Sequence, residues 1–91
     1  MAYRVEVTPP AERELRKLDP HIRKVVNRDI LRLEENPRPR GAEKMETKEK
    51  LYRVYVGPGK NYRATYQIRD EALLVLIVKV GNRKDAYRRV K

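Results

Sequence analysis

The 91-residue chain carries 23 lysines and arginines against 13 aspartates and glutamates, which gives a formal net charge of +10. A chain of this length forms one small domain, expected to span residues 1–91, and its 40% hydrophobic content is typical of a folded protein. Cysteine and serine are absent and His21 is the single histidine. Disulfides, thiolate or histidine-cluster metal sites and Cys or Ser nucleophiles are therefore excluded. We expect a cytoplasmic protein with no membrane partner, because the sequence shows no signal-peptide pattern and no apolar run of spanning length.

The positive charge is concentrated in the second half of the chain. Residues 1–45 hold eleven basic and eight acidic side chains, whereas residues 46–91 hold twelve and five, so the halves carry net charges of +3 and +7. A basic field over part of a small domain attracts polyanions, which favours nucleic acid or an acidic protein as the partner. The alternative is the generally charged surface of a thermophilic protein. The asymmetry favours the polyanion, because it requires a local cause.

The first half of the chain predicts a strand followed by two helices. Residues 3–7 alternate apolar and polar side chains, as a half-buried strand does. Thr8-Pro9 and Asp19-Pro20 each combine a helix N-cap with a proline at the first helical position, so a helix should follow each pair. Both helices carry apolar residues at helical spacing: Ala11, Leu15 and Leu18 in the first, and Ile22, Val25, Val26, Ile30, Leu31 and Leu33 in the second. The simplest arrangement is an antiparallel helical hairpin.

The second half predicts a sheet. A linker containing Pro and Gly covers residues 36–44, and after it the apolar period changes to two. Three strands are predicted, over residues 51–56, 62–68 and 73–80, and the last should be the central strand because it is apolar on both faces. A loop from Gly81 should lead into a short C-terminal helix. The expected fold is α+β, with an N-terminal strand, a two-helix hairpin and a three-stranded antiparallel meander. These strands should form a mostly antiparallel sheet with the helices on one face.

Strand alternation collects basic and tyrosine side chains on the face turned away from the helices. Because the apolar residues must meet the helices, the opposite face should carry Arg53, Tyr55, Arg63, Thr65 and Gln67. Neighbouring strands lie about 4.8 Å apart, which would let Arg53 and Arg63 converge on one anion. Arg83 leaves the end of the last strand, and Tyr87 follows one helical turn later.

This combination of residues suits single-stranded nucleic acid. Guanidinium groups match phosphate oxygens, and tyrosine rings stack on unpaired bases. RNA also carries its own nucleophile, the 2′-hydroxyl, so the protein need only orient it, stabilise charge on phosphorus and move two protons. Arginines would stabilise the charge, and Tyr87 is available as the proton carrier. The alternative is a purely structural role, in which the arginines keep an open sheet soluble and Tyr87 caps the core. Residue spacing alone does not distinguish this structural role from the functional one. Glu43, Glu46 and Glu49 are interpreted as a solvated charged segment.

Two stretches of the chain resemble the RelE family of toxins from toxin–antitoxin systems. One runs from the strand over residues 62–68 to the motif Val-Gly-Asn-Arg-Lys-Asp-Ala-Tyr over residues 80–87, and the other covers residues 11–18. The resemblance implies ribosome-dependent cleavage of messenger RNA in the decoding site, without metal or cofactor, leaving a 2′,3′-cyclic phosphate. It also implies a cognate antitoxin, expected to be acidic, that binds and silences the toxin.

The resemblance also implies roles for individual residues. Arg63 and Arg83 fall where the family has phosphate-stabilising arginines, and Tyr87 falls at a tyrosine implicated in proton transfer or base stacking. Arg53 and Tyr55 fall where the best-known members have two lysines. A guanidinium is a poor general base, so this departure moves proton transfer toward Tyr87 or Tyr55. The expected catalytic residues are Arg53, Arg63, Arg83 and Tyr87. The expected RNA-binding residues are Tyr55, Lys48, Lys50, Lys60 and Lys84.

Two alternatives stay open. The related ParE toxins share the fold and bind DNA gyrase without cutting RNA, and a degenerate member would bind only RNA or its antitoxin. A protein-binding inhibitor needs no convergent set of two arginines and a tyrosine. Arg63, Arg83 and Tyr87 together therefore favour the nuclease.

Overall fold

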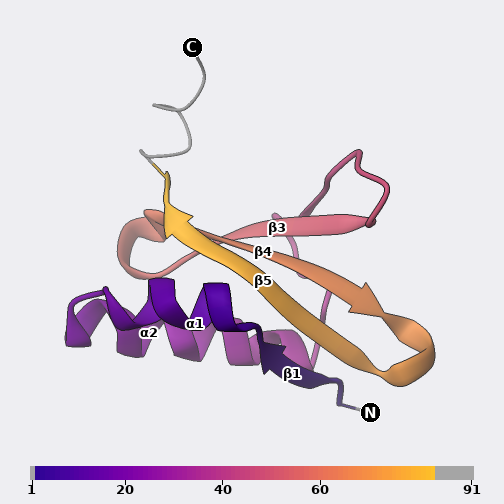
Figure 1. Ribbon diagram of the computed structural model, residues 1–91, viewed down its shortest axis with the longest axis horizontal. Coiled ribbons are helices and arrows are strands. Elements are labelled where there is room, and N and C mark those ends of the chain that lie inside the picture. The colour runs from indigo at the N-terminus through magenta and orange to yellow at the C-terminus, as the bar shows by residue number, and fades with distance from the viewer. Residues whose placement is uncertain (1, 84–91) are drawn as a thin grey trace.

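Two α-helices cover one face of a five-stranded sheet in the part of the chain that the computed structural model describes, residues 2–83 (Figure 1). The α+β fold expected from the sequence is therefore confirmed, whereas the expected C-terminal helix lies outside the described residues. No helix within residues 2–83 is long and apolar enough to span a membrane. The helices and strands are β1 (Arg4–Val7), α1 (Pro9–Arg16), α2 (Pro20–Leu31), β2 (Glu43–Lys44), β3 (Leu51–Val56), β4 (Tyr62–Arg69) and β5 (Leu74–Asn82). Short 3₁₀ turns cover Arg32–Glu34, Pro58–Lys60 and Asp70–Ala72.

Both helices begin where the cap-and-proline pairs predict. The Asp19 side chain accepts a hydrogen bond from the backbone N–H of His21 at 3.1 Å, which satisfies one donor of the first turn of α2. Thr8 has the extended backbone of an N-cap, but its side chain makes no cap bond. Its Oγ1 instead donates to the carbonyl oxygen of Ile77 at 2.8 Å. Thr8 therefore ties the start of α1 to β5.

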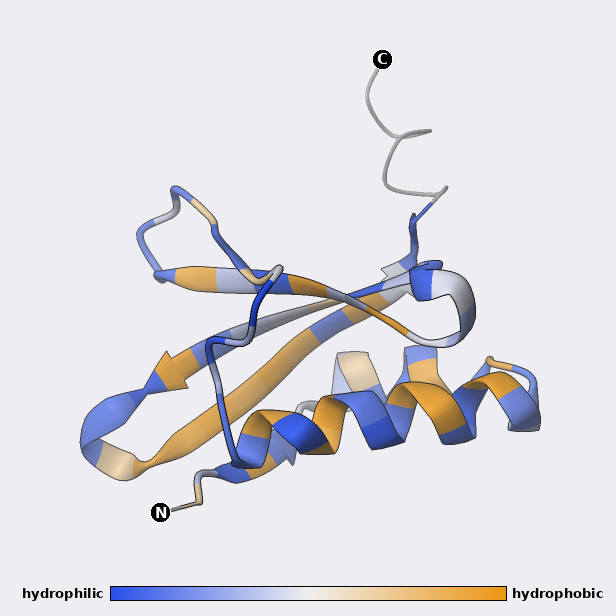
Figure 2. Ribbon diagram, turned by 180° about the vertical axis from the view of Figure 1, so that it is seen from behind, coloured by the Kyte–Doolittle hydropathy of each residue, from blue (hydrophilic) through white to orange (hydrophobic). Residues whose placement is uncertain are grey.

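The core lies between the helices and the sheet. In Figure 2 both helices lie along one face of the sheet, and orange, hydrophobic stretches are seen in the helices and in the strands. The buried cluster consists of Ala11, Leu15, Val26, Ile30, Leu33, Val56, Ala64, Tyr66, Val75, Ile77 and Val80. Leu31, expected to support the apolar stripe of α2, is instead 53% exposed. It follows the buried Ile30 directly, and one residue turns a helix by about 100°, so its side chain leaves the core face.

The strands are arranged in the order β1-β5-β4-β3-β2. β1 runs parallel to β5, and the other neighbouring pairs are antiparallel. β5 is an interior strand as expected, although β4 occupies the middle position. β5 begins one residue later than predicted, because Leu73 adopts a left-handed backbone (φ 49°) that closes the preceding turn. It also extends to Asn82, so Gly81 belongs to a strand and not to the expected loop.

The predicted linker over residues 36–44 is part of the folded structure. Its last two residues, Glu43 and Lys44, form β2 and pair with β3, a strand that the sequence analysis missed. Near its start, the carbonyl oxygen of Pro37 accepts a hydrogen bond from the Tyr66 hydroxyl at 2.8 Å. The Tyr66 side chain is fully buried and its ring stacks on Tyr52 with centroids 5.9 Å apart. Burial raises the pKa of Tyr66 to about 12, because its ionised form would be poorly solvated.

Candidate nucleic-acid interface

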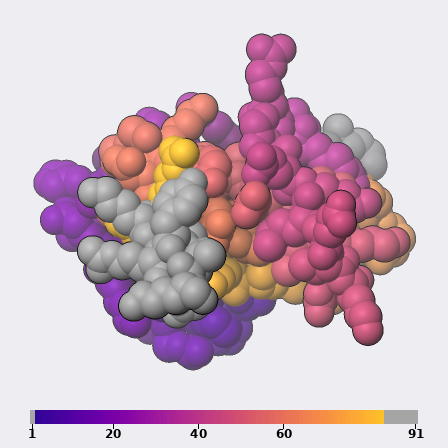
Figure 3. All heavy atoms as spheres, turned by 90° about the horizontal axis from the view of Figure 1, so that it is seen from above, coloured from indigo at the N-terminus to yellow at the C-terminus, as the bar shows by residue number. Residues whose placement is uncertain are grey.

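The face of the sheet turned away from the helices carries the predicted arginines and is the face viewed in Figure 3. Tyr55 on β3, Arg63 on β4 and Gly81 on β5 form one row across it, because directly opposed residues of paired strands project to the same side. Arg63 lies in the middle of this row and is half-buried. A Cβ atom added at Gly81 would meet no other atom of residues 2–83 within 4 Å. Among these residues, the Gly81 position therefore adds no bulk beside Arg63.

A second row runs beside the first and consists of Arg53, Thr65 and Lys79. Arg53 thus lies diagonal to Arg63 and not opposite it. The Nε atom of Arg53 donates to the carboxylate of Glu43 at 2.9 Å, and Glu43 lies on β2, on the far side of β3 from Arg63. The expected convergence of Arg53 and Arg63 on one anion is not what the structure shows, because this ion pair directs the Arg53 side chain toward β2. Glu43 is exposed, as the interpretation as a solvated charged segment expects, and it also holds this ion pair.

Arg83 follows β5 and reaches back over the sheet. Its backbone N–H donates to the carbonyl oxygen of Asn61 at 2.8 Å, which fixes the backbone of Arg83 against the β3–β4 turn. Its guanidinium carbon lies 4.5 Å from the centroid of the Tyr55 ring, within the range of a cation–π contact. The structure therefore brings Tyr55, Arg63 and Arg83 together. We call the two rows and Arg83 the open face, which comprises Arg53, Tyr55, Arg63, Thr65, Lys79, Gly81 and Arg83.

The predicted RNA-binding lysines do not gather at one place. Lys60 lies in the β3–β4 turn, next to Asn61 and so at the Arg83 end of the sheet. Lys48 and Lys50 lie just before β3, at the opposite end, and all three lysines are exposed. Lys84 and Tyr87 lie outside the described residues. Lys79 was missed by the sequence analysis, although strand alternation from Gly81 could have assigned it to the open face.

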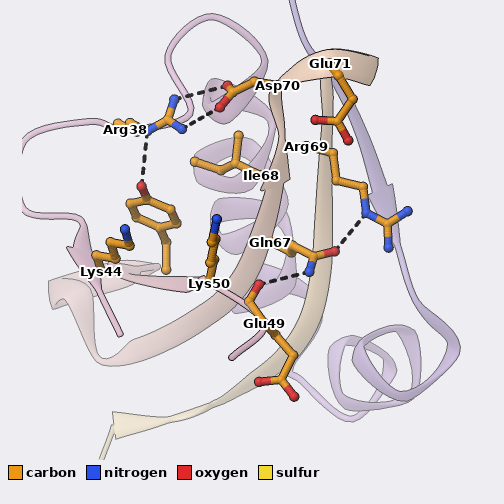
Figure 4. A pocket seen from close by; sticks show the side chains of 10 residues that line it. Arg38, Lys44, Glu49, Lys50, Gln67, Ile68, Arg69, Asp70 and Glu71 are labelled. Carbon is orange, nitrogen blue, oxygen red and sulfur yellow. Dashed lines mark hydrogen bonds and ion pairs between the residues drawn. The ribbon is translucent and has the colours of Figure 1, made fainter. Parts of the chain in front are cut away.

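A polar cavity of about 460 Å³ lies at the Lys50 end of the sheet (Figure 4). On its wall the Arg38 guanidinium donates to both carboxylate oxygens of Asp70, at 2.8 and 3.3 Å, and to the Tyr52 hydroxyl at 3.2 Å. The Tyr3 hydroxyl donates to Asp70 at 2.6 Å. The hydrogen bonds from Arg38 and then Tyr3 lower the pKa of Asp70, and the bond to Asp70 raises the pKa of Tyr3. The donors and acceptors of these side chains are paired with one another. We therefore interpret this wall as a structural contact that holds together β1, the linker and the β4–β5 turn.

The open face has the chemistry of a phosphate site. Guanidinium groups bind phosphate oxygens through planar forks of N–H donors, and Arg63 and Arg83 are anchored on neighbouring strands of the sheet. Within residues 2–83 no group of three or more His, Asp or Glu side chains is placed to hold a metal ion.

Comparisons with known proteins agree with this architecture. A family model described as the ParE toxin of the type II toxin–antitoxin system parDE matches residues 5–87. The mRNA interferase toxin RelE of Escherichia coli K12 is 30% identical over 84 residues, which cover 92% of this chain and 86% of that protein. The toxin–antitoxin complex RelBE2 of Mycobacterium tuberculosis contains a chain with a TM-score of 0.75 and 28% identity, covering 91% of this chain and 100% of that one. A chain of the intact E. coli RelBE complex gives 0.74 and 27%, covering 89% of this chain and 96% of that one.

Proposed function

Because this chain belongs to the RelE/ParE superfamily of toxins from type II toxin–antitoxin systems, we propose that it is an endoribonuclease that cuts messenger RNA on the ribosome. The E. coli relative is named an mRNA interferase, and the open face carries the groups that such a reaction requires. Destruction of the message would stop translation, which is the toxic effect. A site of action on ribosomes corresponds to a cytoplasmic location.

In the proposed reaction, the 2′-oxygen of the RNA attacks the adjacent phosphorus and the bond from phosphorus to the 5′-oxygen breaks. The 2′-hydroxyl loses a proton and the 5′-oxygen gains one, so the products are a 2′,3′-cyclic phosphate and a 5′-hydroxyl. The protein contributes orientation of the nucleophile and stabilisation of the charge on the phosphorane. Ribosome-bound message would be held in the extended form that exposes single bases to the open face.

The observation that carries this proposal is that Arg63 and Arg83 both lie beside Tyr55 on one face of the sheet. Arg63 projects from the middle of a row whose β5 position, Gly81, has no side chain. Arg83 is held over the same row by its contact with Tyr55. Two guanidinium groups on one face of the sheet are suited to a phosphate with two non-bridging oxygens. Arg53 and Lys79 lie at opposite ends of the next row, on β3 and β5, and would meet other backbone phosphates of the bound message.

Proton transfer in this proposal falls to Tyr87, by resemblance to the family. Neither guanidinium is suited to accept a proton at neutral pH, because arginine stays charged. Close cations favour the ionised phenolate and would lower the pKa of such a tyrosine. Phosphate binding by Lys60, at the Arg83 end of the sheet, and by Lys84 remains part of the proposal. Lys48 and Lys50 would contact RNA farther along the strand direction.

The second candidate is inhibition of DNA gyrase, which the ParE description of the matching family model favours. The two functions make different demands on the open face. Gyrase inhibition requires a protein-binding surface but no phosphate site, so it would tolerate loss of one guanidinium from the Arg63 row. RNA cleavage would not.

The test is in vitro translation with purified protein, followed by mapping of message ends. Wild type should produce cuts at defined positions in ribosome-bound message. Arg63→Ala and Arg83→Ala should each slow cutting by about 10²-fold or more, because each removes a donor to charge that develops in the transition state. Arg13→Ala is the matched control, since Arg13 is an exposed arginine of α1, across the sheet from the open face.

Circular dichroism should show that all variants are folded, because neither arginine belongs to the buried core. A folded Arg63→Ala variant that cuts at the wild-type rate would refute the phosphate site. Intact message together with inhibited DNA supercoiling would replace the nuclease by the gyrase inhibitor.

We also propose a cognate antitoxin that is net acidic over the segment contacting this chain. Both solved relatives are chains of toxin–antitoxin complexes. The net charge of +10 and the cations of the open face provide the complementary surface. The antitoxin would silence the toxin by covering or displacing the region of Arg53, Arg63, Arg83 and Tyr87, or by making the complex too large for the decoding site.

A further inference from the structure

We propose that Tyr55 is a positioning residue whose ring holds the Arg83 guanidinium in the orientation that binds the scissile phosphate. The inference rests on the nuclease function proposed above and adds a role for this chain's own Tyr55. The role belongs to the aromatic ring and not to the hydroxyl group.

The backbone of both Tyr55 and Arg83 is held by hydrogen bonds. Tyr55 lies within β3 and is paired with Arg63 of β4. The backbone N–H of Arg83 is bonded to Asn61 O at 2.8 Å, in the turn that joins the same two strands. From these positions the guanidinium carbon lies 4.5 Å from the ring centroid. The contact therefore crosses β4, because β4 separates β5 from β3.

A cation–π contact with Tyr55 need not use the hydrogen-bond donors of Arg83. A guanidinium group is planar, and all its N–H donors point outward in that plane. A ring below the plane attracts the positive charge through its electron-rich face and occupies no donor. Arg83 can thus stack on Tyr55 and present a fork of donors to a phosphate at the same time.

The surroundings explain why Arg83 needs this support. Its side chain is exposed and long, so an unsupported guanidinium would occupy many rotamers and would lose that freedom on binding phosphate. Gly81, two residues earlier on the same face, has no side chain that could pack against the Arg83 side chain. Arg63, in the row that Arg83 overhangs, carries a like charge. The Tyr55 ring is the neighbour that both fixes and attracts the guanidinium.

The experiment separates the ring from the hydroxyl. Tyr55→Leu removes the aromatic face at similar bulk, whereas Tyr55→Phe keeps the face and removes only the hydroxyl. Single-turnover cleavage of ribosome-bound message should fall about 3- to 30-fold in Tyr55→Leu, the range that corresponds to a lost cation–π contact. Tyr55→Phe should rescue this loss and keep the wild-type pH–rate profile. The decrease in Tyr55→Leu should appear mainly in kcat and not in KM, because the positive charge of the oriented Arg83 guanidinium stabilises the developing phosphorane.

A double variant tests whether Tyr55 acts through Arg83. Once Arg83→Ala has removed the guanidinium, Tyr55→Leu should cause little further loss, because the two changes remove the same interaction. Multiplicative losses would overturn the proposal. So would a Tyr55→Phe variant as slow as Tyr55→Leu, because the hydroxyl would then be the working group.

A measurement without RNA keeps this inference separate from the nuclease function. In NMR spectra, the Nε–H proton of Arg83 should be shifted upfield by the ring current in wild type and Tyr55→Phe, and should move downfield in Tyr55→Leu. An unchanged shift in Tyr55→Leu would refute the stack. If wild type shows the ring-current shift but cuts no message, the proposed function fails and the phosphate role fails with it, while the stack itself stands.

Discussion

Replacing Tyr66 by phenylalanine should lower stability at neutral pH, and this loss should disappear at alkaline pH. The Tyr66 side chain is fully buried and its hydroxyl donates to Pro37 O at 2.8 Å. Phenylalanine preserves the ring stacked on Tyr52 but leaves that carbonyl oxygen without its donor. Loss of a buried hydrogen bond of this kind costs about 1–2 kcal/mol, which is the expected decrease in the free energy of unfolding at pH 7.

The alkaline effect follows from the pKa of the same hydroxyl. Burial raises this pKa from its usual value of 10.0 to about 12, so the unfolded chain loses the proton first as the pH rises. The stability contributed by the neutral hydroxyl is therefore complete below pH 10 and is lost as the pH rises through the folded-state pKa. Linkage gives a loss of about 1 kcal/mol by pH 11 and roughly 3 kcal/mol well above pH 12. Tyr66→Phe lacks this loss.

Urea unfolding followed by circular dichroism at pH 7, 9, 10 and 11 checks both effects. The difference in the free energy of unfolding between wild type and Tyr66→Phe should shrink from about 1–2 kcal/mol at pH 7 to near zero at about pH 11. The raised pKa of Tyr3 affects both proteins equally and cancels in the difference. A difference that stays constant from pH 7 to pH 11 would refute the argument that burial holds the Tyr66 hydroxyl neutral.

Three further predictions concern pH, salt and metal. Arg38 and Tyr3 lower the pKa of Asp70, so its stabilising contribution is present above the unfolded-state pKa of about 4 and is lost as the pH falls through the lower folded-state value. Acid unfolding of Asp70→Asn, followed by circular dichroism, should accordingly be less steep than that of wild type. Association with the antitoxin should slow as salt rises, because opposite charges steer the encounter; stopped-flow mixing that gives a salt-independent rate would contradict this. Cleavage should survive replacement of magnesium by a substitution-inert cobalt complex on ribosomes shown to be intact, because in the proposed reaction the arginines, not a metal ion, stabilise the phosphorane; loss of cutting would count against this chemistry.

Local signals in the sequence predicted most of the fold. The prolines after Thr8 and Asp19 mark the starts of α1 and α2, and strict alternation gives the bounds of β3. β2 was missed because two residues show no periodicity, and only pairing with Arg53 and Tyr52 makes them a strand. The anchoring of the linker also depends on distant partners, since Pro37 meets Tyr66 and Arg38 meets Asp70.

The sequence predicts which face of the sheet carries the site residues, but it does not predict the strand register that decides which of them are neighbours. Alternation assigns Arg53, Tyr55 and Arg63 to the face away from the helices, as the structure has them. Register decides which of them are neighbours, and it sets Arg63 opposite Tyr55. The position of the Arg83 guanidinium depends on its side-chain rotamer and on the backbone contact with Asn61. Neither can be predicted from the residues next to Arg83 in the sequence. Tyr87 stays a prediction, because it lies outside the described residues.

The central claim is that RNA bound on the open face supplies its own nucleophile. It is tested most directly with ribosome-bound message that carries a single 2′-deoxy nucleotide on the 5′ side of the mapped cut. The account predicts cutting of the unmodified message, with a 2′,3′-cyclic phosphate detected by mass spectrometry, and no cutting at the 2′-deoxy position. Equal cutting of both messages at that position would contradict the claim, because the nucleophile would then come from water or from the protein.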